Sequence, residues 1–215
     1  MKANPRSETS DAEAVALSLP SELVRAAFAQ TKKGTNDQYI TFGCQDYSET
    51  SLPLKTELCI ALIVEALEQL GCQCREDQKH LRDYLYHALS RDAGLLVIEN
   101  GTVVRTAEVL SPDGSQQILA RAIQVSRLEK GAFDLIYHAS SNLAAILSSK
   151  TDGIKLIFGN AKGRELVSSL YSEWPINRLM YHQIENFMSR LSEGISPNDG
   201  VLRILEMGAG TGGTS

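Results

Sequence analysis

The sequence predicts a mainly helical chain of the α+β class, with very little β structure. Apolar residues recur at helical spacing through most of the 215 residues, and several of these segments end at a glycine. β patterns are confined to residues 95–106 and 201–207. The composition is 43% hydrophobic and 22% charged, as in ordinary globular proteins. The chain can therefore bury a sizeable core.

The N-terminal part predicts a leader, one helix and a loop. Residues 1–18 are polar and rich in Ala and Ser, which favours a flexible leader or linker. The segment SELVRAAFAQTKK is expected to be a helix, with Ser21 as its N-cap and Gly34 at its end. A loop rich in turn-forming residues is expected to follow, up to Pro53.

Two further helices and a hairpin follow between about residues 55 and 110. TELCIALIVEALEQL is the most apolar helix candidate and ends at Gly71, and HLRDYLYHALS repeats the pattern and ends at Gly94. LLVIE and TVVRT then flank Asn100-Gly101, the strongest short hairpin signal. Two helices and a hairpin outline a winged-helix unit. We therefore expect residues 19–110 to form a helical, winged-helix-like subdomain.

Residues 111–200 are expected to be helical again. SQQILARAIQVS and DLIYHASSNLAAILSSK come first, and IKLIFGNAKGRELVSSLYSEW follows, open to division at Gly159 and Gly163. The Trp174-Pro175 pair marks a break, because a residue before proline avoids the helical region. Pro175 then suits the first position of the last helix. Residues 201–207 read as a short β run, and residues 201–215 form the last predicted segment.

The charge balance argues against nucleic acid and anionic membrane as partners. The chain carries a net charge of −5, all of it in residues 1–110. Both polyanions would be repelled, and the second helix of the winged unit pairs Arg82 and Arg91 with two aspartates. No apolar run is long enough for a transmembrane helix, and no secretory signal is recognisable. The sequence predicts a cytoplasmic protein.

Metal sites are not expected. The cysteines (Cys44, Cys59, Cys72 and Cys74) lack C-x-x-C spacing, and reduced thiols are the expected state. His80 and His87 are seven residues apart, without a third ligand nearby in the sequence.

The C-terminal glycine motif indicates a nucleotide-like ligand. The β run feeds a turn in which Gly208, Gly210 and Gly212 are spaced two and two, with Glu206 before the first glycine. Such a turn presents backbone amides at the end of a strand, and the glycines allow close approach. The spacing differs from G-x-G-x-x-G and is poor for pyrophosphate. It suits the methionine moiety of S-adenosylmethionine. The alternative is a glycine-rich tail without a ligand.

This motif carries a family resemblance. RILEMGAGTGGTS closely resembles the first S-adenosylmethionine-binding motif of class I methyltransferases. Its doubled glycine and following threonine are typical of C-methyltransferase domains of fungal non-reducing polyketide synthases. The upstream segments LPSELVRAAFAQTKK, LKTELCIALIVEALEQLGC and LAAILSSK through YHQIENFM resemble the N-terminal lid region of that domain. The resemblance covers roughly residues 19–215.

The resemblance implies a fold and a reaction. Residues 111–200 would be a helical lid, and residues 201–215 the first strand and glycine motif of a truncated Rossmann-like methyltransferase core. The reaction would be methylation of the α-carbon of a poly-β-keto chain, carried on an acyl carrier protein beside other synthase domains, in secondary-metabolite biosynthesis. The runner-up interpretations are a truncated small-molecule O-methyltransferase and a non-catalytic interaction fragment.

The resemblance also implies site residues. The cofactor would contact Glu206, Gly208, Ala209, Gly210 and Gly212. An aromatic residue such as Tyr181 or Trp174 would stack on adenine or close the pocket, or else pack the lid on the core; Asn177 and Arg178 are equally ambiguous. The family's histidine base lies downstream of the motif, so it is expected beyond Ser215. His138 and His182 lie upstream of the motif. The 215-residue chain alone is therefore expected to be inactive.

Overall fold

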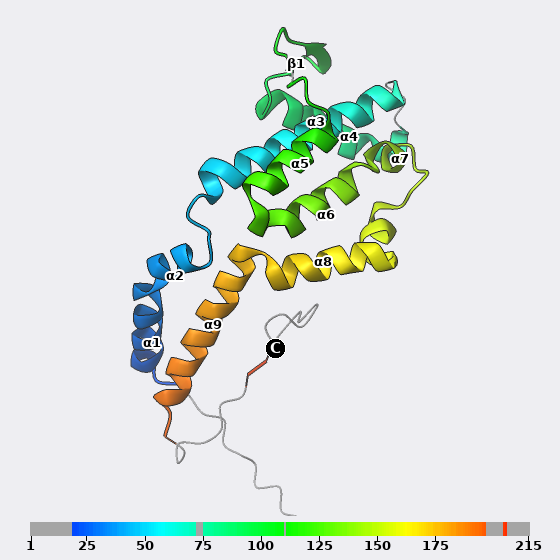
Figure 1. The fold of residues 1–215 in the computed structure, drawn as a ribbon. Helices are drawn as coiled ribbons and strands as arrows, with labels where there is room; N and C mark the ends of the chain where they lie inside the picture. The colour runs from blue at the N-terminus through cyan, green and yellow to red at the C-terminus, as the bar shows by residue number, and fades with distance from the viewer. Residues whose placement is uncertain (1–18, 72–74, 110, 197–203, 206–215) are drawn as a thin grey trace, which may run out of the picture. The chain divides into compact units, whose positions relative to one another are not determined.

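The computed structural model describes residues 19–71, 75–109, 111–196 and 204–205. This part of the chain is mostly helical with one two-stranded sheet, which confirms the predicted class (Figure 1). The α-helices and strands are α1 Ser21–Lys33, α2 Thr35–Thr41, α3 Leu52–Leu70, α4 Lys79–Arg91, β1 Leu96–Glu99, β2 Thr102–Arg105, α5 Ser115–Val125, α6 Lys130–Ser140, α7 Leu143–Leu147, α8 Ala161–Glu173 and α9 Pro175–Glu193. Short π-helical turns, η1 Tyr47–Ser51 and η4 Lys155–Gly159, and short 3₁₀ turns, η2 Glu76–Gln78 and η3 Arg127–Glu129, lie between them.

The chain divides into two compact units. One comprises Met1–Asn36 and Tyr181–Ser215, and the other comprises Asp37–Met180. In the first unit, Arg190 donates a hydrogen bond to the Gln30 side chain at 2.8 Å and so links α9 to α1. The predicted segment boundaries at 110/111 and 200/201 do not coincide with these units and stay a prediction.

The core of the second unit is built around α3, whose apolar residues face two groups of neighbours. One cluster joins α3 to α4 and α7, and contains Ile63, Val64, Ala66, Leu85, Leu89, Leu95, Leu143, Ala144 and Leu147. The other joins α3 to α5 and α6, and contains Leu58, Ala61, Leu62, Ile118, Ala122 and Phe133. A helix that is apolar on most sides is therefore buried on most sides, as its sequence indicates.

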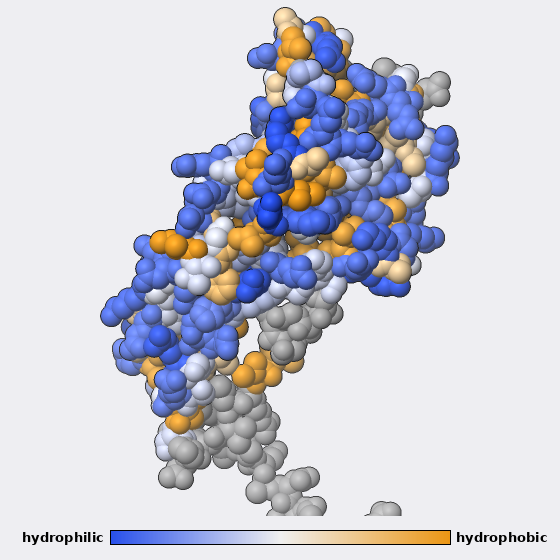
Figure 2. Space-filling model, viewed as in Figure 1, coloured by the Kyte–Doolittle hydropathy of each residue, from blue (hydrophilic) through white to orange (hydrophobic). Residues whose placement is uncertain are grey.

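The hairpin forms at the predicted position. β1 pairs antiparallel with β2, with Val97 opposite Val104, and the turn residues Asn100 and Gly101 have φ values of 50° and 79°. Positive φ at both turn positions is the geometry that matches strand twist in a two-residue hairpin. Val97 and Val104 are exposed, and hydrophobic residues are visible on the hairpin at the top of Figure 2.

Several helix ends also agree with the sequence. Gly71 ends α3 in the left-handed conformation, with φ of 53°, and Pro175 begins α9 after an extended Trp174. Gly34 follows α1, but Ser21 is the first helical residue of α1 rather than its N-cap. The position before it is held by Pro20, which has the extended backbone of a cap and no side-chain hydroxyl to make the bond.

Two other expectations need correction. The expected loop before Pro53 contains α2 and η1. The expected helix DLIYHASSNLAAILSSK is broken between α6 and α7, where the Asn142 side chain donates to the carbonyl of His138 at 2.8 Å. Such local bonds compete with helix continuation. Ile204 and Leu205, the described residues of the predicted 201–207 strand, are exposed and carry no strand assignment, and the other five residues lie outside the described part of the chain, so this strand stays a prediction. No described strand pairs with them.

Within the described residues, no helix combines the length and the apolar character that crossing a membrane requires.

Candidate functional site

Most of the predicted cofactor site lies outside the described residues. This holds for Glu206, Gly208, Ala209, Gly210 and Gly212. The remaining candidate, Tyr181, lies on α9 and is half-buried. The role of these residues therefore stays a prediction.

Trp174 lies in a packed environment between α8 and α9. Its indole Nε1 donates a hydrogen bond to Oε2 of Glu129 at 2.6 Å, and its ring meets that of Tyr47 edge-on at 6.3 Å between centroids. Nearby, Asn177 donates to the carbonyl of Leu170 at 3.2 Å. These contacts favour a packing role for Trp174 and Asn177 over contact with a ligand.

The centre of this environment is a buried ion pair between Lys55 on α3 and Glu129 in η3. Their side chains are only 10% and 5% exposed, and Nζ of Lys55 contacts Oε2 of Glu129. The ammonium also lies 4.5 Å from the ring centroid of Tyr47, 5.1 Å from that of Trp174 and 5.7 Å from that of Phe133. We call these five residues the Lys55 cluster. It joins η1, α3, η3, α6 and the α8–α9 junction.

The polar groups of the Lys55 cluster satisfy one another, as in a structural contact. Glu129 accepts from both Lys55 and Trp174, so its charge is compensated in a buried place. Burial raises the pKa of the Tyr47 hydroxyl, and the negative charge of Glu129 raises it further. The pKa of the nearby Cys44 thiol is raised for the same two reasons, in the same order. Both groups stay protonated at neutral pH, and neither is activated as a base or nucleophile.

The Lys55 cluster was not predicted from the sequence, although the sequence contains one signal for it. Lys55 is the single charged residue in the first turn of a very apolar helix, where the helix dipole disfavours a cation. A lysine in that place indicates a nearby carboxylate. Nothing in the sequence indicates that the carboxylate is Glu129, 74 positions away.

The histidines and cysteines bring no metal site together in the described part of the chain, where no group of three His, Cys, Asp or Glu side chains is arranged to hold an ion. His138 has a buried Nε2 atom without a hydrogen-bond partner among the described residues, and His182 lies 3.6 Å from Glu185. Cys44 and Cys59 are free thiols, and burial raises the pKa of Cys59 as well. Cys72 and Cys74 lie outside the described residues.

Known proteins provide the decisive comparison. A non-reducing polyketide synthase of Emericella nidulans is 40% identical over 217 residues, which is 94% of this chain and 8% of that protein. The 3-methylorcinaldehyde synthase of a Phoma species is 39% identical over 93% of this chain and 8% of its own length. The chain is homologous to a segment of fungal non-reducing polyketide synthases. It spans less than a tenth of the length of these curated relatives. No protein-family model matches it.

Solved methyltransferase structures are similar to this chain. The CMeT domain of the citrinin polyketide synthase matches with a TM-score of 0.87 and 31% identity, over 93% of this chain and 56% of that one. The CurJ carbon methyltransferase matches with a TM-score of 0.74 and 21% identity, over 89% of this chain and 54% of that one, which is a likeness of fold alone. The helical architecture is therefore that of part of a methyltransferase domain.

Proposed function

We propose that this chain forms part of a C-methyltransferase domain of a polyketide synthase. The domain transfers a methyl group from S-adenosylmethionine to the α-carbon of a β-keto intermediate carried on an acyl carrier protein. The observation that carries the proposal is the likeness to the citrinin synthase domain over 93% of the chain. The homology to polyketide synthases also favours it over a free small-molecule O-methyltransferase.

The glycine motif is the part of the chain proposed to hold the cofactor. S-adenosylmethionine, when bound, supplies an electrophilic methyl group. Gly208, Gly210 and Gly212 allow the backbone to approach it, with amides as donors, and Glu206 orders the loop or meets the cofactor's polar end. Glu206 would repel the negative charge of a pyrophosphate. The motif therefore fits a ligand with a cationic amino-acid end better. We propose that Tyr181 contributes an aromatic face to the same ligand.

The chemistry asked of the domain is modest. A carbon between two carbonyl groups is acidic, so a general base of moderate strength can form the enolate that attacks the methyl group. We assign no residue of this chain as that base. The contribution of this chain is to bind the cofactor and to supply the helical part of the domain.

Cofactor titration tests the proposal. In a complete methyltransferase domain that contains this segment, Gly210→Val fills space that the ligand needs and should weaken S-adenosylmethionine binding about 100-fold or more in calorimetry, at about 1.4 kcal/mol per tenfold. Gly114→Val is the matched control. A Cβ there meets nothing nearer than the Glu65 side chain at 3.8 Å, so affinity should be unchanged. Equal affinities for wild type and Gly210→Val would contradict the assignment.

Product analysis tests the reaction. With a carrier-bound β-keto thioester and a ¹³C-methyl donor, the complete domain should give a product whose labelled carbon is bonded to carbon in its NMR spectrum. A label bonded to oxygen would favour the O-methyltransferase instead. The 215-residue chain alone should give no turnover, and turnover by it would show that the base lies within these residues.

A further inference from the structure

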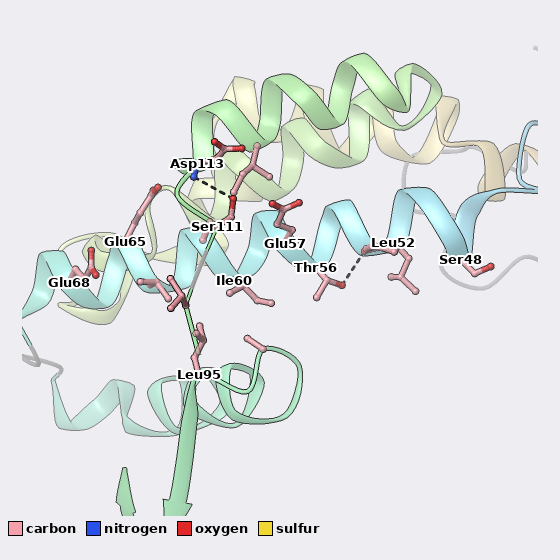
Figure 3. A pocket seen from close by; sticks show the side chains of 16 residues that line it. Ser48, Leu52, Thr56, Glu57, Ile60, Glu65, Glu68, Leu95, Ser111 and Asp113 are labelled. Carbon is pink, nitrogen blue, oxygen red and sulfur yellow. Dashed lines mark hydrogen bonds between the residues drawn. The ribbon is translucent and has the colours of Figure 1, made fainter. Parts of the chain in front are cut away.

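A groove beside α3 is a hollow in the described part of the chain that the methyltransferase proposal does not use. Its volume is about 640 Å³, and it lies wholly within the Asp37–Met180 unit. Figure 3 shows Leu52, Thr56 and Ile60 along one side of α3, with Leu95 opposite them on the connection from α4 to β1. This volume is within the range of small-molecule binding pockets, about 300–1,000 Å³.

The floor of the groove has the pattern of ridges on which a second helix can pack. Five lining residues follow a row of four-residue steps along α3: Leu52, Thr56, Ile60, Val64 and Glu68. A second row runs beside it and comprises Pro53, Glu57, Ala61 and Glu65. Rows of this spacing are the ridges into which a second helix packs. From Leu52 to Val64 the first row is about 18 Å long at 1.5 Å per residue, which matches about three turns of a partner helix.

Apolar surface in the groove remains open to solvent. Leu52 is 45% exposed and Val109 is 86% exposed, although both are large apolar side chains. Leu95 and Ile118, at the bottom, are almost fully buried and belong to the two core clusters. The groove therefore presents a rigid apolar floor with two exposed apolar residues at its rim. An apolar stripe on a partner would cover them.

The charge of the groove defines the partner further. The lining residues within the described chain include four carboxylates and neither lysine nor arginine: Glu57, Glu65, Glu68 and Asp113. Arg121 on α5, which is not among the lining residues, donates to both Glu57 and Asp113, the latter at 2.9 Å. Glu65 accepts from the backbone and hydroxyl of Ser115 at 2.8 and 2.7 Å. One guanidinium for four carboxylates leaves an excess of negative charge.

From this combination we propose that the groove is a docking site for a basic amphipathic helix from outside this chain. Its apolar stripe packs on the Leu52–Val64 row, and its lysine or arginine side chains meet the carboxylates at the rim. A second copy of this chain fits less well, because the chain itself carries a net charge of −5. The inference goes beyond methyl transfer and does not depend on it.

A peptide-binding experiment on the 215-residue chain tests the proposal. The probes are two dye-labelled 14-residue amphipathic helices, one of leucine and lysine and one of leucine and glutamate, followed by fluorescence anisotropy. Thr56→Arg places a bulky cation in the row. Thr41→Arg is the matched control, because Thr41 makes the same hydroxyl bond to the carbonyl four residues earlier but lies on α2, outside the groove.

The lysine peptide should bind wild type and Thr41→Arg alike, and Thr56→Arg at least tenfold more weakly. The glutamate peptide should bind none of them. Equal binding of the lysine peptide to all three proteins would show general attraction to an acidic surface and overturn the proposal. So would binding of the glutamate peptide with similar affinity. Self-association of the chain that Thr56→Arg abolishes, measured by sedimentation, would identify a second copy as the occupant and also refute it.

Discussion

Replacing Glu129 with leucine leaves the ammonium of Lys55 buried without a carboxylate. The Lys55 side chain is 10% exposed, so water cannot replace the lost partner fully. The change also removes the acceptor of the Trp174 indole. Breaking a buried pair from one side typically costs about 3–5 kcal/mol of unfolding free energy. We expect Glu129→Leu to fall in this range.

The double variant separates the charge effect from the packing effect. Lys55→Met with Glu129→Leu removes both charges and keeps apolar volume, and such replacements are often neutral or stabilising. We therefore expect the double variant to be more stable than Glu129→Leu alone, with a coupling free energy of about 2–3 kcal/mol. The control is Glu165→Gln, which breaks an exposed pair with Lys162 at 3.3 Å and should cost less than about 1 kcal/mol.

The assay is urea unfolding followed by tryptophan fluorescence. Trp174 is the single tryptophan of the chain and belongs to the cluster, so its emission reports on the Asp37–Met180 unit. If Glu129→Leu shifts the midpoint no more than Glu165→Gln does, the pair is not buried as described. If the double variant loses as much unfolding free energy as Lys55→Met and Glu129→Leu lose in sum, the two side chains are not coupled and the reasoning fails.

Three further predictions concern backbone geometry and pH. Gly163→Ala should cost about 1–3 kcal/mol, because a Cβ there overlaps two backbone carbonyls of η4. Gly114→Ala should be near neutral in the same urea assay, because its Cβ makes only an ordinary contact with the Glu65 side chain at 3.8 Å. Gly101→Val demands positive φ from a branched side chain and should abolish the cross-strand nuclear Overhauser contacts of the hairpin while the helical circular dichroism persists. The pKa values of the Cys44 and Cys59 thiols are raised in the folded state, so the unfolded chain loses these protons first as pH rises. The free energy of unfolding should therefore be at its full value below about pH 8.5 and should fall as pH rises through the folded-state pKa values. A Cys44→Ala, Cys59→Ala variant whose unfolding free energy falls with the same slope up to about pH 9.5 would contradict this.

Local signals in the sequence predicted the elements that local physics decides. Gly71 ends α3 and Asn100-Gly101 turns the hairpin, because left-handed backbone favours these residue types at both places. Pro175 begins α9 for a similarly local reason. The α6–α7 break was missed, since the competition of Asn142 with the helix depends on one side-chain rotamer.

Long-range chemistry was harder to predict. The Lys55–Glu129 contact joins residues 74 positions apart, and no periodicity connects them. The groove beside α3 depends on how the segment before α5 packs, which the spacing of apolar residues does not specify. The cofactor motif could be proposed from the sequence because its residues are contiguous, and since residues 206–213 lie outside the described residues it stays a prediction.

The position of α3 in both core clusters has a consequence for how the Asp37–Met180 unit opens. Leu62 contacts the α5–α6 side and the adjacent Ile63 contacts the α4–α7 side, so neither side can detach without baring apolar surface on the same helix. Amide protons on the two sides should therefore exchange with solvent in one cooperative event rather than in two stages. Because α3 belongs to both core clusters, a substitution at its centre should destabilise both clusters at once.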